Sequence, residues 1–172
     1  MSIRSIVENL LINVENEGGK SVSNHLIHMQ QRGILRSSMT VEGAFSELEN
    51  TLKREYENIF KKIFDLSPTE LDIRDLKNVF FHFNKRQYDK CKDILSEMNL
   101  YLVRGSEQRH FDEYRFDRIN STQAVIDYEL LKLTRKIEEK SEAYRYHIVN
   151  NLGGNNARIS INSVDNSSNI VN

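Results

Sequence analysis

Apolar residues recur at intervals of three and four along most of the first 152 positions, which is the period of one face of an α-helix. The clearest example is residues 41–65, where the positions opposite the apolar stripe alternate between glutamate and lysine. Alternation of charge four residues apart is typical of a solvated helix face. The pattern therefore predicts an amphipathic helix that packs by its stripe. The members of this stripe are Phe45, Leu48, Leu52, Tyr56, Ile59 and Ile63.

Residues that cap or break helices divide the rest of this region into further predicted helices. Gly18–Gly19 and Gly33 have the character of left-handed C-terminal caps. Thr40 is a good N-cap, and Ser67–Pro68 and Asn84 each begin a sequence typical of a capping box. We therefore expect an all-α bundle of five to seven helices. The predicted segments are residues 2–15, 21–32, 41–65, 67–83, 84–104 and 106–151, with a cap at Asn120 that divides the last of them.

The longest predicted helix, residues 121–151, is apolar on two sides. At about 1.5 Å per residue it would extend roughly 45 Å. Its main seam follows the heptad pattern of a coiled coil, and Ala124, Tyr128 and Leu131 form a second stripe. A helix of this kind lies inside a bundle, or between a bundle and a partner. We assign the interaction surface to the main seam, whose members are Ile126, Leu130, Leu133, Ile137 and Tyr144.

The composition changes sharply at Gly153–Gly154. Six of the last eighteen residues are asparagine and four are serine. One interpretation is a disordered tail, because such a segment buries little apolar surface. The other is a β-hairpin that pairs with another chain, in which Ile159 and Ile161 alternate with polar residues and add to the interaction surface. The sequence thus predicts a helical domain, residues 1–152, and a polar tail, residues 153–172, whose removal would weaken assembly.

The overall charge gives no indication of a nucleic-acid-binding protein. Lysine and arginine number 24 against 25 acidic residues, so the net charge is −1, whereas proteins that bind phosphate backbones usually carry a basic surplus. Cys91 is the single cysteine, which excludes an internal disulfide and suits a reducing compartment. The sequence shows neither a secretory signal nor an apolar run approaching the roughly 20 residues of a membrane span. We expect a cytoplasmic protein without cofactors or membrane contact.

Arg104 and His110 stand six residues apart beside a predicted helix junction. In an all-α chain of this length, the pair resembles the signature of the HEPN superfamily, small α-helical ribonucleases of bacterial toxin and defence systems. The resemblance implies that Arg104 stabilises the phosphate and that His110 transfers the proton. Gly105 departs from the pattern, because the residue after the arginine is usually polar.

The segment 21–35 resembles the recognition helix of winged-helix repressors of the ArsR kind. The resemblance implies that Val22 and Leu26 pack inward while other side chains face DNA bases. The sequence departs from the family after this helix, because residues 37–40 lead directly into another helix instead of a β-wing. The implied DNA-binding residues are Ser21, Ser23, Asn24 and His25.

Other candidate chemistry is sparse. The pair Glu107 and His110 forms an E-x-x-H, but a di-iron bundle needs a second such motif, and none is present, so we expect no metal site. Cys91 lies on an apolar stripe and is expected in the core. The sequence therefore favours a non-catalytic interaction or self-assembly module, which binds itself as a homo-oligomer or binds another protein. A DNA-binding regulator and a HEPN-like ribonuclease are the alternatives.

Overall fold

The computed structural model describes residues 2–101, 105–152, 158–161 and 168–171, with the backbone alone at residue 145 and from residue 147 onward. The chain divides into two compact units, residues 1–133 and 134–172, and each is described by itself. The described elements are α1 (Ile3–Gln31), α2 (Ser38–Asp65), α3 (Glu70–Glu97), α4 (Ser106–Leu152), β1 (Arg158–Ile161) and β2 (Ser168–Val171).

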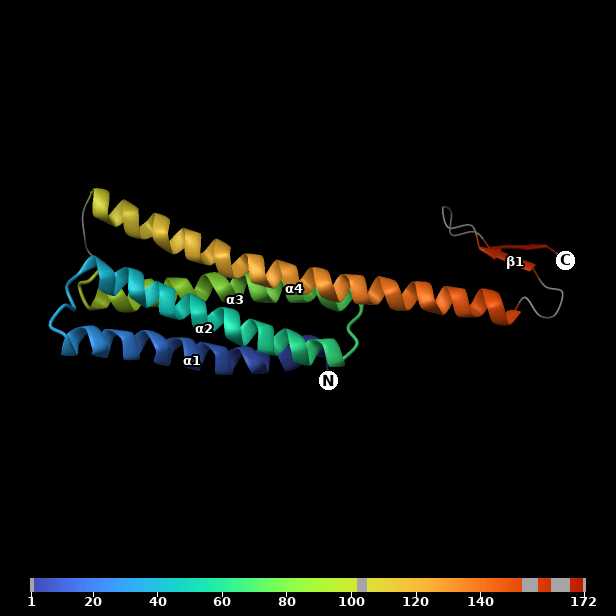
Figure 1. Ribbon diagram of the computed structural model, residues 1–172, viewed down its shortest axis with the longest axis horizontal. Coiled ribbons are helices and arrows are strands. Elements are labelled where there is room, and N and C mark those ends of the chain that lie inside the picture. Colours follow the sequence, from blue (N-terminus) through green and yellow to red (C-terminus); the bar gives the residue numbers. More distant parts are fainter. Residues whose placement is uncertain (1, 102–104, 153–157, 162–167, 172) are drawn as a thin grey trace. The chain divides into compact units, whose positions relative to one another are not determined.

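The first unit is an all-α helical bundle, as the sequence predicts. Successive helices run in opposite directions, and α1 packs against both α2 and α3 (Figure 1). The first part of α4 contacts α2 through the hydroxyls of Ser46 and Tyr114, which are 2.8 Å apart. It contacts α3 through Asn84, whose side-chain nitrogen donates to the carbonyl of Ile119 over 3.2 Å. Antiparallel neighbours joined by short connections are typical of an up-and-down bundle.

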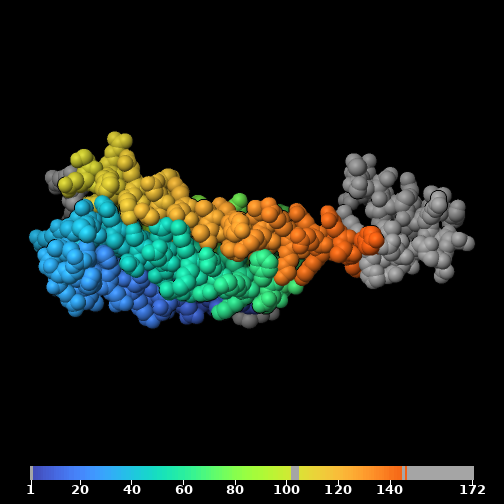
Figure 2. Space-filling model, in the orientation of Figure 1, coloured from blue at the N-terminus to red at the C-terminus, as the bar shows by residue number. Residues whose placement is uncertain are grey.

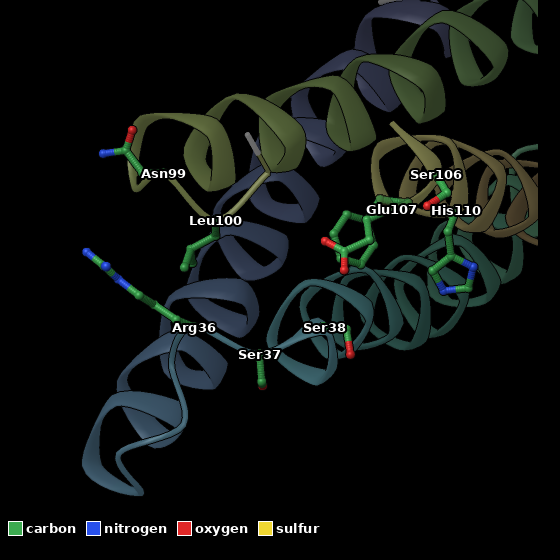
Figure 3. Close-up of a pocket in the computed structure, with 9 residues that line it drawn as sticks. Arg36, Ser37, Ser38, Asn99, Leu100, Ser106, Glu107 and His110 are labelled. Carbon is green, nitrogen blue, oxygen red and sulfur yellow. The ribbon is translucent and has the colours of Figure 1, made fainter. Parts of the chain in front are cut away.

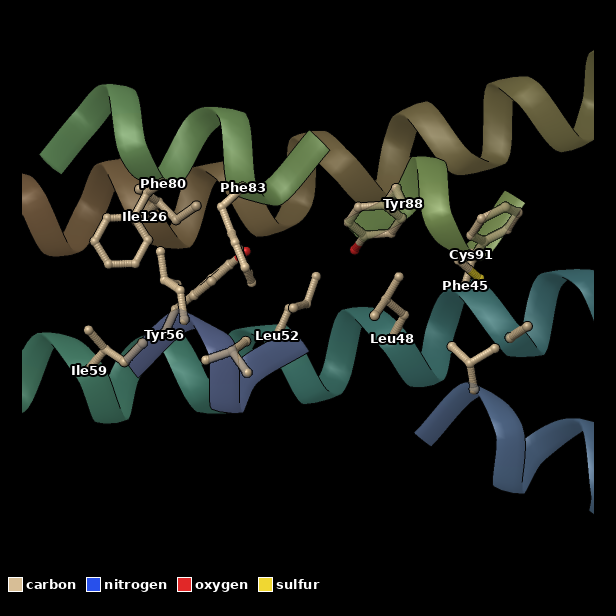
Figure 4. Packing of buried hydrophobic residues seen from close by; sticks show 14 of the residues in the cluster. Phe45, Leu48, Leu52, Tyr56, Ile59, Phe80, Phe83, Tyr88, Cys91 and Ile126 are labelled. Atoms are coloured by element: carbon tan, nitrogen blue, oxygen red, sulfur yellow. The ribbon is translucent and has the colours of Figure 1, made fainter. Parts of the chain in front are cut away.

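The core follows the apolar stripe predicted for residues 41–65, all six members of which are buried in α2. They face the buried side chains of α3 and α4 (Figure 4). The ring of Phe80 stacks on Phe60 with 4.7 Å between centroids and meets Tyr56 edge-on at 5.6 Å, both favourable aromatic geometries. Cys91 is buried among these residues, as predicted, and burial raises the pKa of its thiol to about 12.

The two helices predicted for residues 2–15 and 21–32 are a single helix, α1. Gly18–Gly19 lies in its interior and does not cap a helix end. A Cβ on Gly18 would lie 3.0 Å from Cδ1 of the buried Leu48, so this glycine allows α1 to pass close to α2. Gly33 ends the helix as predicted, with the left-handed φ of +70° that favours glycine.

Asn84 and Asn120 do not begin helices either, because α3 and α4 run through them without interruption. Asn84 is buried, and its side-chain oxygen accepts hydrogen bonds from the hydroxyls of Tyr56 (3.3 Å) and Thr122 (2.9 Å). A residue type common at helix ends serves here as a polar contact inside the core. The described residues therefore form four helices, and the expectation of five to seven is wrong.

Two predicted helix starts are also displaced. The side chain of Thr40 is buried inside the first turn of α2, where its hydroxyl donates to the carbonyl of Ile34 over 3.0 Å. At α3 the capping box is formed by Thr69 and Asp72, while Ser67 precedes the helix with a φ of +51°. Both starts lie within a few residues of the predicted positions, a margin that is usual for helix boundaries.

The second unit contains the last part of α4 and the two strands. β1 and β2 pair in the antiparallel sense, with Ile159 opposite Ile170 and Ile161 opposite Ser168. The side chains of Ile159 and Ile161, both predicted to contact a partner, lie outside the described residues. Among the helices that are described, none is apolar over a stretch long enough to cross a bilayer.

Replacing Asn84 with alanine should lower the free energy of unfolding by about 1–3 kcal/mol, because the substitution leaves the buried hydroxyl of Tyr56 without its partner and removes two further hydrogen bonds to α4. Denaturant titration measures this change. Asn78→Ala is the matched control, since Asn78 is exposed on the same helix and its replacement should alter stability by less than about 0.5 kcal/mol. Equal stability of the two variants would show that the Asn84 contacts contribute nothing.

Candidate functional site

A cleft of about 700 Å³ opens where the N-terminal turns of α2 and α4 lie beside the end of α3 (Figure 3). His110, the predicted catalytic histidine, lines this cleft, and its Nε2 lies 3.0 Å from Oε1 of Glu42. A carboxylate in this position orients an imidazole for proton transfer. Arg104, the predicted partner of His110, lies outside the described residues. The cleft is lined by Arg36, Ser37, Ser38, Asn99, Leu100, Ser106, Glu107, His110 and Phe111.

The His110–Glu42 pair has the setting of a surface ion pair. The imidazole is exposed and Glu42 is half-buried, and pairs of this kind contribute about 0–1 kcal/mol to stability. Glu107, the other member of the E-x-x-H, lies in the same cleft. Across the part of the chain that is described, no three histidine, cysteine or carboxylate side chains converge as a metal site would require.

Two of the four predicted DNA-binding residues face α2. The hydroxyl of Ser21 donates to the carbonyl of Glu47 over 3.3 Å, and Nε2 of His25 lies 3.1 Å from the carbonyl of Thr40. A Cβ on Gly43 would lie 2.3 Å from the His25 ring, so this ring fits against α2 only because position 43 has no side chain.

The other two predicted DNA-binding residues, Ser23 and Asn24, are exposed. They belong to the middle of the 29-residue helix α1, however, and no turn precedes them. A recognition helix is short and follows such a turn. The helix-turn-helix geometry that the resemblance implies is therefore missing from residues 2–101.

A group of ionisable side chains joins α2 to α4 and is centred on the buried Glu49. The carboxylate of Glu49 accepts from Lys53 over 2.6 Å and from Nη1 of Arg118 over 2.7 Å. Burial opposes ionisation of Glu49, but the hydrogen bonds from Lys53, Ser121 and Arg118 outweigh it and hold the pKa of this carboxyl below its usual value. Arg118 also lies over the ring of Tyr114, and Lys53 donates to Ser121.

These contacts indicate a structural role for Glu49, Lys53 and Arg118, which we call the Glu49 cluster. Its charges are opposite and already hydrogen-bonded to each other, which leaves no poised base or nucleophile. Together with the contacts of Asn84, the cluster holds one side of α4 against α2 and α3. It therefore determines which of the two apolar stripes on α4 points inward.

The inward stripe is the seam that the sequence assigned to a partner. Ile126, Leu130 and Leu133 are buried in the core of the first unit, so the chain itself covers them. In the second unit, Ile137 is half-buried and Tyr144 is exposed. The interaction surface predicted for the three buried residues is thus misplaced, because the seam packs within the chain.

The opposite side of α4 presents apolar residues to solvent. Phe116, Tyr128 and Leu131 are 62%, 60% and 47% exposed, and Ala124 lies between them. Their spacing of eight, four and three residues places them on one side of the helix. We call these four residues the outward face. The sequence identified three of them as the second stripe but missed Phe116, which the same spacing would have included. Figure 2 shows α4, in yellow to orange, at the surface of residues 1–133.

The Glu49 cluster should make the free energy of unfolding depend on pH in the acid range. The pKa of Glu49 is lower in the folded chain than in the unfolded chain, so the unfolded chain binds the proton more readily. The contribution of Glu49 to the free energy of unfolding is therefore complete above the unfolded pKa of about 4.3, and it is lost as the pH falls through the folded pKa. Denaturant titrations from pH 7 to pH 3 should show a shallower acid loss for Glu49→Gln than for the wild type.

The same substitution should cost about 1–3 kcal/mol at neutral pH, since it weakens hydrogen bonds to two charged groups. Glu57→Gln, which removes an exposed carboxylate from the same helix, is the matched control. Parallel acid profiles for the wild type and Glu49→Gln would contradict the assigned ionisation.

Comparisons with protein-family models, with curated proteins and with solved structures find no match to this chain. The function must therefore be inferred from the geometry of the described residues. Two features of the first unit are relevant, the cleft at His110 and the outward face of α4.

Proposed function

We propose that the protein is a non-catalytic α-helical module that acts by self-assembly or by binding another protein. The observation that carries this proposal is the outward face of α4. Most exposed apolar residues are scattered singly and need no explanation, whereas several on one face of one helix are typical of an interaction surface. Aromatic residues such as Phe116 and Tyr128 are also enriched at protein interfaces.

The setting of the outward face supports the same proposal. Lys132 lies over the ring of Tyr128 at 4.9 Å and pairs with Glu129 over 2.6 Å, so a charged group borders the apolar residues. An apolar centre with a polar rim is the usual anatomy of an interface. The inward side of α4 is buried in the core of the first unit at Ile126, Leu130 and Leu133, so little order needs to be gained on binding.

Light scattering over a range of concentrations tests assembly. The mass of the wild type should rise above the 20.2 kDa of one chain, and Leu131→Glu should reduce this rise because it places a charge within the apolar contact. Leu71→Glu is the matched control, since Leu71 is exposed on α3 and its replacement should leave association unchanged.

A variant without residues 153–172 separates the outward face from the tail that the sequence predicts to take part in assembly. Association that disappears with this deletion but persists in Leu131→Glu would place the contact in the tail and overturn the role of the outward face. A mass of one chain for the wild type at every concentration would contradict self-assembly itself.

A HEPN-like ribonuclease is the second candidate, and the position of His110 in the cleft beside Glu42 favours it. If the cleft cleaves RNA, wild-type protein should degrade a single-stranded RNA and His110→Ala should lose most of that activity, since a general acid or base contributes about 10²–10⁴-fold. His28→Ala, at an exposed position on α1, is the matched control and should remain active. Absence of cleavage by the wild type would exclude this candidate.

A further inference from the structure

We infer that the outward face of α4 binds the same face of a second copy of this chain in an antiparallel, two-fold symmetric arrangement. This inference rests on the proposed function and deepens it, because it names the partner and the geometry of the contact. A two-fold interface uses one patch on both copies, so the patch must be complementary to itself. The outward face meets this requirement in its residue sizes and in its charges.

Ala124 stands near the middle of the outward face, with Phe116 on one side and Tyr128 and Leu131 on the other. A small residue at this position allows two helices to approach to the roughly 8–10 Å at which their side chains interdigitate. With Ala124 at the crossing point of an antiparallel pair, Phe116 of one copy lies beside Leu131 of the other. The ring of each Phe116 then covers the aliphatic side chain of Leu131 in the other copy.

The charges beside the outward face differ in sign at its two ends. Asp117 is exposed at the N-terminal end and makes no ion pair with any described residue. Lys132 borders the C-terminal end, where it pairs with Glu129 of its own helix over 2.6 Å. These two positions lie seven or eight residues on either side of Ala124, which is about 11 Å along the helix. An antiparallel pair therefore places Asp117 of each copy near Lys132 of the other.

A parallel pair would bring Asp117 near Asp117 and Lys132 near Lys132, and like charges disfavour such a contact. The same argument favours a second copy over an unrelated acidic or basic partner, because either of those would be repelled at one end of the face. The Glu49 cluster does not compete for this surface, since it binds the other side of α4.

Charge reversal tests the pairing. Asp117→Lys and Lys132→Asp should each weaken self-association by about tenfold, since each replaces two attractive contacts of the dimer with repulsive ones. An equimolar mixture of the two variants should recover wild-type affinity as a heterodimer, because the introduced lysine of one copy then meets the introduced aspartate of the other. Sedimentation equilibrium measures the dissociation constants of the wild type, of each variant and of the mixture. Recovery in the mixture also shows that neither single variant is misfolded.

Cysteine cross-linking tests the direction independently of charge. Under mild oxidation, Ala124→Cys should form a disulfide between copies, while Asp117→Cys should cross-link to Lys132→Cys in a mixture but not to itself. Cys91 is buried and serves as the internal control, since wild-type protein should not cross-link.

The outcomes distinguish this inference from the proposed function. Self-association that neither charge reversal weakens, or a cross-link of Asp117→Cys to itself, would overturn the antiparallel contact and leave assembly standing. A wild-type chain that is monomeric at all concentrations would overturn the antiparallel contact together with self-assembly, and would leave only the binding of another protein.

Discussion

The rotation of α4 about its own axis is the constraint on which the surface of the first unit depends, and buried polar contacts set it. Apolar side chains pack without strong directional preference, whereas hydrogen bonds require defined distances and angles. Asn84 bonds to Thr122 and to the backbone of α4, and Glu49 bonds to Arg118. These contacts select one of two apolar stripes for the core. The remaining stripe is left exposed to water, which is why Phe116, Tyr128 and Leu131 are available for the proposed contact.

Much of the bundle could be predicted from the sequence, because burial of a stripe such as that of α2 depends on spacing alone. The number of helices could not. Asn84 and Gly18 are residue types that often mark helix ends, and their actual roles depend on Thr122 and Leu48, which are distant in the chain. Local preference is weak evidence where a residue makes a tertiary contact, because the contact outweighs a propensity difference of about 1 kcal/mol.

The candidate site could be predicted only in part. The spacing of Ala124, Tyr128 and Leu131 identified a second apolar stripe, but the choice between the two stripes required the position of Arg118 relative to Glu49. Without that contact, either stripe of α4 can be the buried one, and the heptad pattern favours the longer stripe as the interaction surface. The cleft at His110 was likewise beyond prediction, since it joins segments from three helices.

NMR measurement of the solvent accessibility of α4 tests most directly the claim that one apolar stripe of this helix is buried and the other is exposed. A soluble paramagnetic agent broadens the signals of side chains that water reaches. We expect Tyr128 and Leu131 to broaden in dilute protein and to become protected as the concentration rises, while Ile126 and Leu133 stay protected throughout. Tyr128 signals that remain fully accessible at every concentration, or Ile126 signals that broaden as strongly as those of Tyr128, would contradict the assignment of the two sides of α4.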